Sequence, residues 1–111
     1  MKNTEQHARK DILRAIDQVA LTMEGHELAD YDRDFRIHLI VERCVEIVSE
    51  ASRRLSPESK AAYPQVPWRA IESVGNKLRH EYQRVDPVIM WKIATQSLPE
   101  LRPVVQALIE R

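Results

Sequence analysis

The polar residues between Ser73 and Arg84 have the types and the spacing that phosphate chemistry requires. Five of them recur at intervals of three and four residues, so on a helix they share one face: Ser73, Asn76, Lys77, His80 and Arg84. A histidine takes or gives a proton near neutral pH, and Lys77 and Arg84 place positive charge around His80. The polar side of an ordinary amphipathic helix has the same pattern. The spacing alone therefore allows a phosphate site without requiring one.

The same segment indicates a helix that buries its opposite side. Its apolar residues are spaced by three, four and seven positions: Ile71, Val74, Leu78 and Val85. His80 comes two residues after Leu78, about 200° around a helix, so it points away from the buried side. A glycine in a helix interior costs about 1 kcal/mol relative to alanine. We therefore expect a second helix or a ligand to approach the backbone closely at Gly75.

Helical spacing of apolar residues extends along most of the chain. A first helix is predicted over about residues 5 to 23, ending at Gly25, and a second over about residues 33 to 55. Their buried stripes consist of Ile12, Ile16, Val19 and Met23 in the first, and Ile37, Val41, Cys44, Val48, Ala51 and Leu55 in the second. Residues 24–34 are rich in Asp and Glu, which predicts a solvated acidic loop between the two helices.

The later helices begin at recognisable caps. Ser56-Pro57-Glu58 indicates a short turn of helix, and Trp68 opens a third long helix that reaches about residue 84. Asp86-Pro87 caps and opens a fourth helix. Ser97-Leu98-Pro99-Glu100 has the form of a capping box and predicts a last helix to the C-terminus, in which Pro103 predicts a kink or a later start. No strand-like alternation appears, so the predicted fold class is all-α, an antiparallel bundle of four to five helices.

Composition excludes several classes of protein. The length of 111 residues predicts one domain over residues 1–111. The 17 basic and 17 acidic side chains cancel, so no overall positive field marks a nucleic-acid binder, although a local basic patch is compatible with this balance. The two glycines, Gly25 and Gly75, are too far apart to form a phosphate loop. No run of apolar residues suits a membrane span or a signal peptide, which predicts a soluble cytoplasmic protein.

The single cysteine and the histidines outside the polar face point to structural roles. Cys44 rules out an intramolecular disulfide, and its place in a buried stripe predicts a small core residue rather than a reactive thiol. His38 shares a side of the second helix with Glu42, so the two can form a solvent-facing pair. No His, Asp and Glu have metal-ligand spacing, so we expect no metal cofactor.

Three segments together resemble a known signature. Pro67-Trp68-Arg69, the run Gly75-Asn76-Lys77-Leu78-Arg79-His80-Glu81-Tyr82 and then Val85-Asp86 resemble the pattern P-W-x-x-[IL]-x-x-x-R-N-x-L-x-H-x-Y-x-x-[IV]-D of the HEPN superfamily, specifically its HepT-like toxin family. Residues 47–55 resemble the I-x-G-E-A-x-x-L segment of that family, and Trp91 and residues 98–101 match it as well. The resemblance covers nearly the whole chain in the expected order.

The resemblance implies both a fold and an activity. HepT-like proteins are antiparallel helical bundles that form homodimers, with the two signature helices facing each other across a cleft. They are toxins of toxin–antitoxin systems and cut RNA without a metal ion. Carried over to this chain, His80 would transfer protons and Asn76 would orient the phosphate or His80. The antitoxin partner is a minimal nucleotidyltransferase, which silences the toxin by transferring AMP to the position of Tyr82.

The chain departs from this pattern at the catalytic arginine. Gly75 stands where the family has that arginine, and Ser49 replaces the glycine of the I-x-G-E-A segment. Arg79, directly before His80, and Lys77 are the two residues that can supply the missing charge, with Arg84 as a further phosphate contact. Lysine offers a point charge rather than the fork of a guanidinium.

The same departure supports an alternative function. Without the family's arginine, the chain would be a non-catalytic HEPN dimer that docks the nucleotidyltransferase. The acidic residues 24–34 would then be a candidate docking surface. A cleavage assay on the unmodified protein separates this binding module from a ribonuclease.

Overall fold

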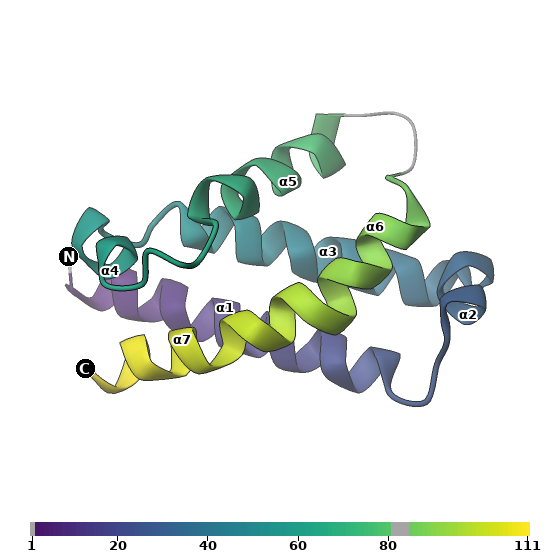
Figure 1. The fold of residues 1–111 in the computed structure, drawn as a ribbon, viewed down its shortest axis with the longest axis horizontal. Helices are drawn as coiled ribbons and strands as arrows, with labels where there is room; N and C mark the ends of the chain where they lie inside the picture. The colour runs from purple at the N-terminus through teal and green to yellow at the C-terminus, as the bar shows by residue number, and fades with distance from the viewer. Residues whose placement is uncertain (1, 81–84) are drawn as a thin grey trace.

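Helices account for most of the described residues in the computed structural model, which describes residues 2–80 and 85–111 and gives only the backbone of residues 2, 3 and 80. The chain begins with α1 (Lys2–Met23), and α3 (Phe35–Ser52) returns antiparallel beside it (Figure 1). Helix α5 (Trp68–His80) packs on α3. The chain then runs back along α1 through α6 (Pro87–Lys92), a π-helical turn η1 (Ile93–Ser97) and α7 (Leu98–Glu110). The described residues contain no strand, which confirms the all-α antiparallel bundle.

One apolar core holds these helices together. Every residue of the two predicted stripes on α1 and α3 is buried, together with Leu98, Leu101, Val105 and Leu108 of the C-terminal segment. Cys44 is one of these core residues, and the pKa of its thiol is raised, because the effect of burial exceeds the opposite effect of the Arg43 charge. The thiol therefore stays neutral, as expected of a structural cysteine. Among residues 2–80 and 85–111, no helix combines the length and apolar character that a bilayer span needs.

The predicted helix ends at Gly25, Ser56 and Asp86 are confirmed, and Asp34 forms a further cap that was not predicted from the sequence. Gly25, directly after the first helix, has a positive φ of 76°, a conformation that favours glycine. The side chain of Asp34 accepts a hydrogen bond from the Arg36 N–H at the start of α3. Ser56 caps the short helix α4 (Pro57–Ala61), and Asp86 caps α6 in the same way.

The prediction of an acidic loop over residues 24–34 is wrong. Helix α2 (Leu28–Arg33) occupies most of this segment, and its Tyr31 is fully buried. At its start the Glu27 N–H donates to the Asp30 side chain at 2.8 Å. A single aromatic side chain that reaches the core thus outweighs the surrounding acidic residues, since burying an aromatic ring contributes far more than solvating a short loop.

The expected solvent-facing pair of His38 and Glu42 is also wrong, because His38 is 8% exposed. Its Nδ1 lies 3.3 Å from the Tyr31 carbonyl oxygen, and its ring meets Phe35 edge-on at 5.5 Å. Helix α2, which the sequence did not reveal, covers this side of α3 and buries His38.

Ser97 does not cap a new helix, contrary to the predicted capping box. Its backbone is helical, with φ −64° and ψ −47°, and its side chain makes no capping hydrogen bond. The helix instead continues through η1, where the Leu98 N–H bonds to the Ile93 carbonyl. Pro99 lacks an N–H to continue the α-helical ladder, and a wider π-turn just before it lets the helix pass without a break. Pro103 lies inside α7.

A cluster around Glu5 fixes the start of α1 against α4. The Glu5 carboxylate accepts hydrogen bonds from the Ser59 hydroxyl, from Arg9 Nη2 at 2.7 Å and from the Ser56 N–H at 3.2 Å. Burial alone raises the pKa of this carboxyl, but the hydrogen bonds from Ser59, Arg9 and Ser56 and the charge of Arg9 together hold it below its usual value of 4.5.

We predict that this cluster makes the fold acid-sensitive. Because the folded-state pKa of Glu5 is lowered, its contribution is fully present above about pH 4.5 and is lost as the pH falls through the folded value. Glu5→Gln should lower the free energy of unfolding at pH 7 by about 1–3 kcal/mol. It should also flatten the loss of stability between pH 5 and about pH 2, measured by urea denaturation. The control is Glu24→Gln, at the other end of the same helix. Equal pH slopes for wild type and Glu5→Gln would contradict this account.

Candidate functional site

Gly75 lies at a close approach between α5 and α3. The Ser49 hydroxyl accepts a hydrogen bond from the Gly75 N–H at 3.1 Å and donates one to the Glu72 carbonyl at 2.8 Å. A Cβ at position 75 would lie 2.5 Å from the Ser49 Oγ and 2.6 Å from the Ser49 Cβ, distances that neighbouring atoms cannot adopt. The expected close approach at Gly75 is therefore confirmed, and a second helix makes it.

This contact gives a physical reason for the two departures from the HepT-like pattern. A side chain at position 75 would point into α3, and Ser49 fills the space that an arginine there would need. The family pattern has a glycine at the position of Ser49 on α3 and an arginine at the position of Gly75 on α5. In this chain the glycine is on α5 and the larger residue, Ser49, is on α3. Ser49 and Gly75 are thus a matched pair, and the arginine role cannot fall to position 75.

Arg79 extends along α3 and is held there by an acidic residue. Its Nη1 donates to the Glu50 Oε1 at 2.9 Å, and the Arg79 side chain is 35% exposed. Arg79 stands one helical turn after Gly75, so both lie on the side of α5 that faces α3. Sequence reasoning gave Glu50 no role, because its partner is 29 residues away on another helix.

The outward face of α5 carries the other candidate residues. Asn76 and Lys77 are both exposed, as predicted, and lie on the side turned away from α3. His80 is the last residue of α5 that the structure describes, and it follows Arg79 by about 100° around the helix. The His80 side chain lies outside the described residues, and so do Tyr82 and Arg84. Of the predicted site residues, the structure thus describes Asn76, Lys77 and Arg79 with their side chains.

Four further polar contacts, all in the first half of α5, fix the register of this helix. Arg53 Nη2 donates to the same Glu72 carbonyl as Ser49, at 2.8 Å, and the Glu72 carboxylate pairs with Lys60 at 2.5 Å. The Trp68 indole N–H donates to the Lys60 and Tyr63 carbonyls at 3.1 and 3.2 Å, which anchors the start of the helix. The first half of α5 is therefore tied to its surroundings, and the pair of Arg79 with Glu50 holds the later part of the helix.

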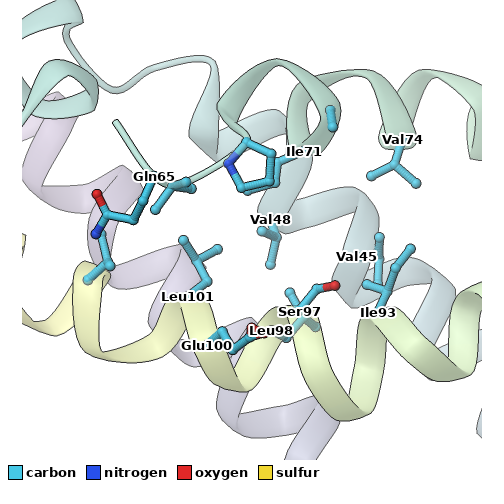
Figure 2. A pocket seen from close by; sticks show the side chains of 14 residues that line it. Val45, Val48, Gln65, Ile71, Val74, Ile93, Ser97, Leu98, Glu100 and Leu101 are labelled. Carbon is cyan, nitrogen blue, oxygen red and sulfur yellow. The ribbon is translucent and has the colours of Figure 1, made fainter. Parts of the chain in front are cut away.

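An apolar pocket of about 370 Å³ lies between α3, α5 and α7 (Figure 2), and Arg79 is not among the residues that line it. Its lining includes Val45, Val48, Ile71, Val74, Ile93, Leu98 and Leu101, with Gln65, Ser97 and Glu100 as polar members. None of the described residues that line it is basic, so it offers nothing to a phosphate group. In the described part of the chain, no three His, Cys, Asp or Glu side chains form a group suited to a metal ion.

The bundle and its signature helix define a HEPN-type helical protein. The family model described as "Ribonuclease HepT-like" matches residues 12–108. The chain therefore belongs to the HepT-like ribonuclease family of the HEPN superfamily.

Curated relatives agree with this assignment. The chain is 29% identical over 102 residues to a protein of Thermococcus cleftensis named probable ribonuclease HepT, covering 92% of this chain and 93% of that protein. A candidate RNase of Methanocaldococcus jannaschii is 26% identical, over 90% of this chain and 83% of its own length. A candidate RNase of Caldanaerobacter subterraneus is 28% identical, over 90% and 89%. No solved structure matches the chain significantly.

We predict that Gly75→Ala forces α5 away from α3, because the new Cβ would overlap Ser49. Overpacking of this kind costs about 1–3 kcal/mol, measured by chemical denaturation. The double variant Ser49→Gly, Gly75→Ala removes the overlapping atoms and should recover part of that loss. Additive effects of the two single substitutions would contradict the close contact.

Proposed function

We propose that this protein is the ribonuclease toxin of a toxin–antitoxin pair and that it cuts RNA as a homodimer without a metal ion. The observation that carries this proposal is the match to the HepT-like ribonuclease family across residues 12–108, with Asn76 and Lys77 of the signature segment exposed on α5. In the chain itself, α5 carries exposed Asn76 and Lys77 and an oriented Arg79, and ends at His80. We propose too that residues 1–111 form one domain around the single core.

The proposed reaction is an internal transfer within the RNA. The ribose 2′-hydroxyl attacks the adjacent phosphorus, the bond from phosphorus to the 5′-oxygen breaks, and a 2′,3′-cyclic phosphate forms. One His80 takes the proton from the 2′-hydroxyl, and the His80 of the second protomer gives a proton to the leaving 5′-oxygen. Two signature helices facing each other across the dimer would supply this pair.

Arg79 is the stronger of the two candidates for stabilising the phosphoryl oxygens. Its guanidinium has a planar fork of donors, and Glu50 fixes one edge of that fork, which reduces the freedom lost when a phosphate binds. Lys77 lies on the outward face and offers a point charge. Asn76, one turn before His80, is placed to donate a hydrogen bond to the phosphate or to hold His80.

We predict that the purified protein cleaves cellular RNA in the presence of EDTA. His80→Ala should lower the cleavage rate by about 10²–10⁴, because proton transfer is lost. Arg79→Ala should lower it by about 10²–10³ through lost charge stabilisation, while Lys77→Ala should have a smaller effect. The measurement is the rate of appearance of cyclic-phosphate ends.

Two outcomes would change this assignment. A large loss in Lys77→Ala with normal activity in Arg79→Ala would transfer the charge role to Lys77. No cleavage by wild-type protein, when mass spectrometry shows an unmodified Tyr82, would contradict the ribonuclease. The alternative would then stand: a non-catalytic dimer that docks the nucleotidyltransferase. The ion pair that neutralises Arg79 favours that alternative, because it leaves the site with less free charge.

We propose that a minimal nucleotidyltransferase silences the protein at Tyr82. The phenol oxygen attacks the α-phosphorus of ATP, pyrophosphate leaves, and the phenol proton is released. The added AMP places a bulky anion two residues from His80 and repels the RNA backbone.

We predict that Tyr82→Phe stays active in the presence of the nucleotidyltransferase and ATP, whereas wild type is switched off and gains the mass of one AMP. Tyr63→Phe is the matched control and should be modified and silenced like wild type. AMP transfer to Tyr82→Phe protein would show that another residue is the acceptor.

A further inference from the structure

A groove of about 560 Å³ runs between α1, α3 and the end of α5. Four arginines from three parts of the fold line it: Arg14 on α1, Arg43 on α3, Arg54 just after α3, and Arg79 on α5. Ala15, Cys44 and Ile47 are its apolar lining residues. Arg79 thus belongs both to this groove and to the candidate site beside His80.

The carboxylates in the groove pair with the arginines but are fewer than the arginines. Arg43 Nη1 pairs with Glu46 at 2.8 Å, and Arg79 Nη1 pairs with Glu50 at 2.9 Å. Asp11 is shared by two arginines at longer distances, 3.6 Å from Arg14 Nη1 and 3.9 Å from Arg54 Nη2. Four guanidinium groups therefore face three carboxylates, which leaves the groove positive on a chain whose net charge is zero.

The guanidinium groups remain accessible to a ligand. The Arg14 side chain is 78% exposed, and those of Arg43 and Arg54 are at least half exposed. Arginine prefers phosphate among anions because its fork binds two oxygens at once. Arginines spaced along a groove with an apolar lining suit an extended chain of phosphates and riboses better than a single small anion.

We propose that this groove binds the phosphodiester backbone of single-stranded RNA on one side of the cleavage point. The inference rests on the proposed ribonuclease function and deepens it by naming where the substrate lies. An RNA strand whose reacting phosphate contacts Arg79 continues past Glu50 into the groove and exchanges the Asp11 contacts of Arg14 and Arg54 for phosphate contacts. Glu50 opposes this binding while it orients Arg79, because its charge is of the same sign as the phosphate.

The test measures binding of a short single-stranded RNA to His80→Ala protein in EDTA, by fluorescence anisotropy at several salt concentrations. In this background the RNA stays uncut. Arg14→Gln and Arg43→Gln should each weaken binding and reduce the slope of log affinity against log salt by about 0.7, the value for one lost phosphate contact on a single strand. Glu50→Gln should strengthen binding.

Arg33→Gln is the matched control. Arg33 is 79% exposed and lies 3.6 Å from Asp30, three residues before it, just as Arg14 lies 3.6 Å from Asp11, three residues before it. It lies on α2, outside the groove. Its substitution should leave both the affinity and the salt slope unchanged. Thermal unfolding of all variants checks that each one is folded.

The outcomes separate the groove from the ribonuclease. Unchanged affinity and slope in folded Arg14→Gln and Arg43→Gln would overturn the groove, even if wild-type protein cuts RNA with a normal rate. Equal losses in Arg33→Gln would also overturn it, since any surface arginine would then serve. Selective losses in the two groove variants would support it, even if the unmodified protein failed to cut RNA. If the groove variants bind RNA normally but lose binding to an acidic protein partner, the groove would be assigned to that partner instead.

Discussion

The contact between Ser49 and Gly75 determines where the signature helix lies. One hydroxyl bridges the Gly75 N–H and the Glu72 carbonyl, and this is possible only because position 75 has no side chain. Since a helix is rigid, fixing this point fixes the direction of every later residue on α5. Together with the contacts at Trp68 and Glu72, this close approach brings Arg79 against Glu50 and turns Asn76 and Lys77 to solvent.

Local signals in the sequence predicted most of the bundle. The stripe from Ile12 to Met23 and the caps at Ser56 and Asp86 depend on residues within a few positions of one another, and all are confirmed. The errors arose where distant packing decides the outcome. An acidic segment becomes helix α2 because Tyr31 reaches a core built by other helices. A good capping sequence at Ser97 is overridden because the chain gains more by continuing as one helix along α1.

In the candidate site, too, local spacing predicts some features, and contacts between distant residues decide the others. Spacing alone placed Asn76 and Lys77 on an exposed face, because three- and four-residue intervals determine the face of a helix. Spacing had no means of finding Glu50, which meets Arg79 only across two helices. A glycine inside a helix predicted a close approach at position 75, and the family resemblance marked the same residue as the loss of an arginine. The structure shows the helix contact, which excludes an arginine there. The packing of α5 against α3 therefore excludes an arginine at position 75, whatever role an arginine would have in catalysis.

A net charge of zero is compatible with binding a polyanion, because charge acts locally in physiological salt. Fields of exposed charges are largely screened beyond about 8 Å, so a phosphate senses the side chains around it rather than the whole surface. In the groove beside α5, the carboxylates hold the guanidinium groups in place, and Asp11 divides its charge between two of them. Arg43 and Arg79, which pair closely with Glu46 and Glu50, are already ordered in the free protein, so less of their ordering cost opposes RNA binding. A net charge of zero excludes strong non-specific attraction of RNA to the whole surface, but it is compatible with a groove that binds RNA locally.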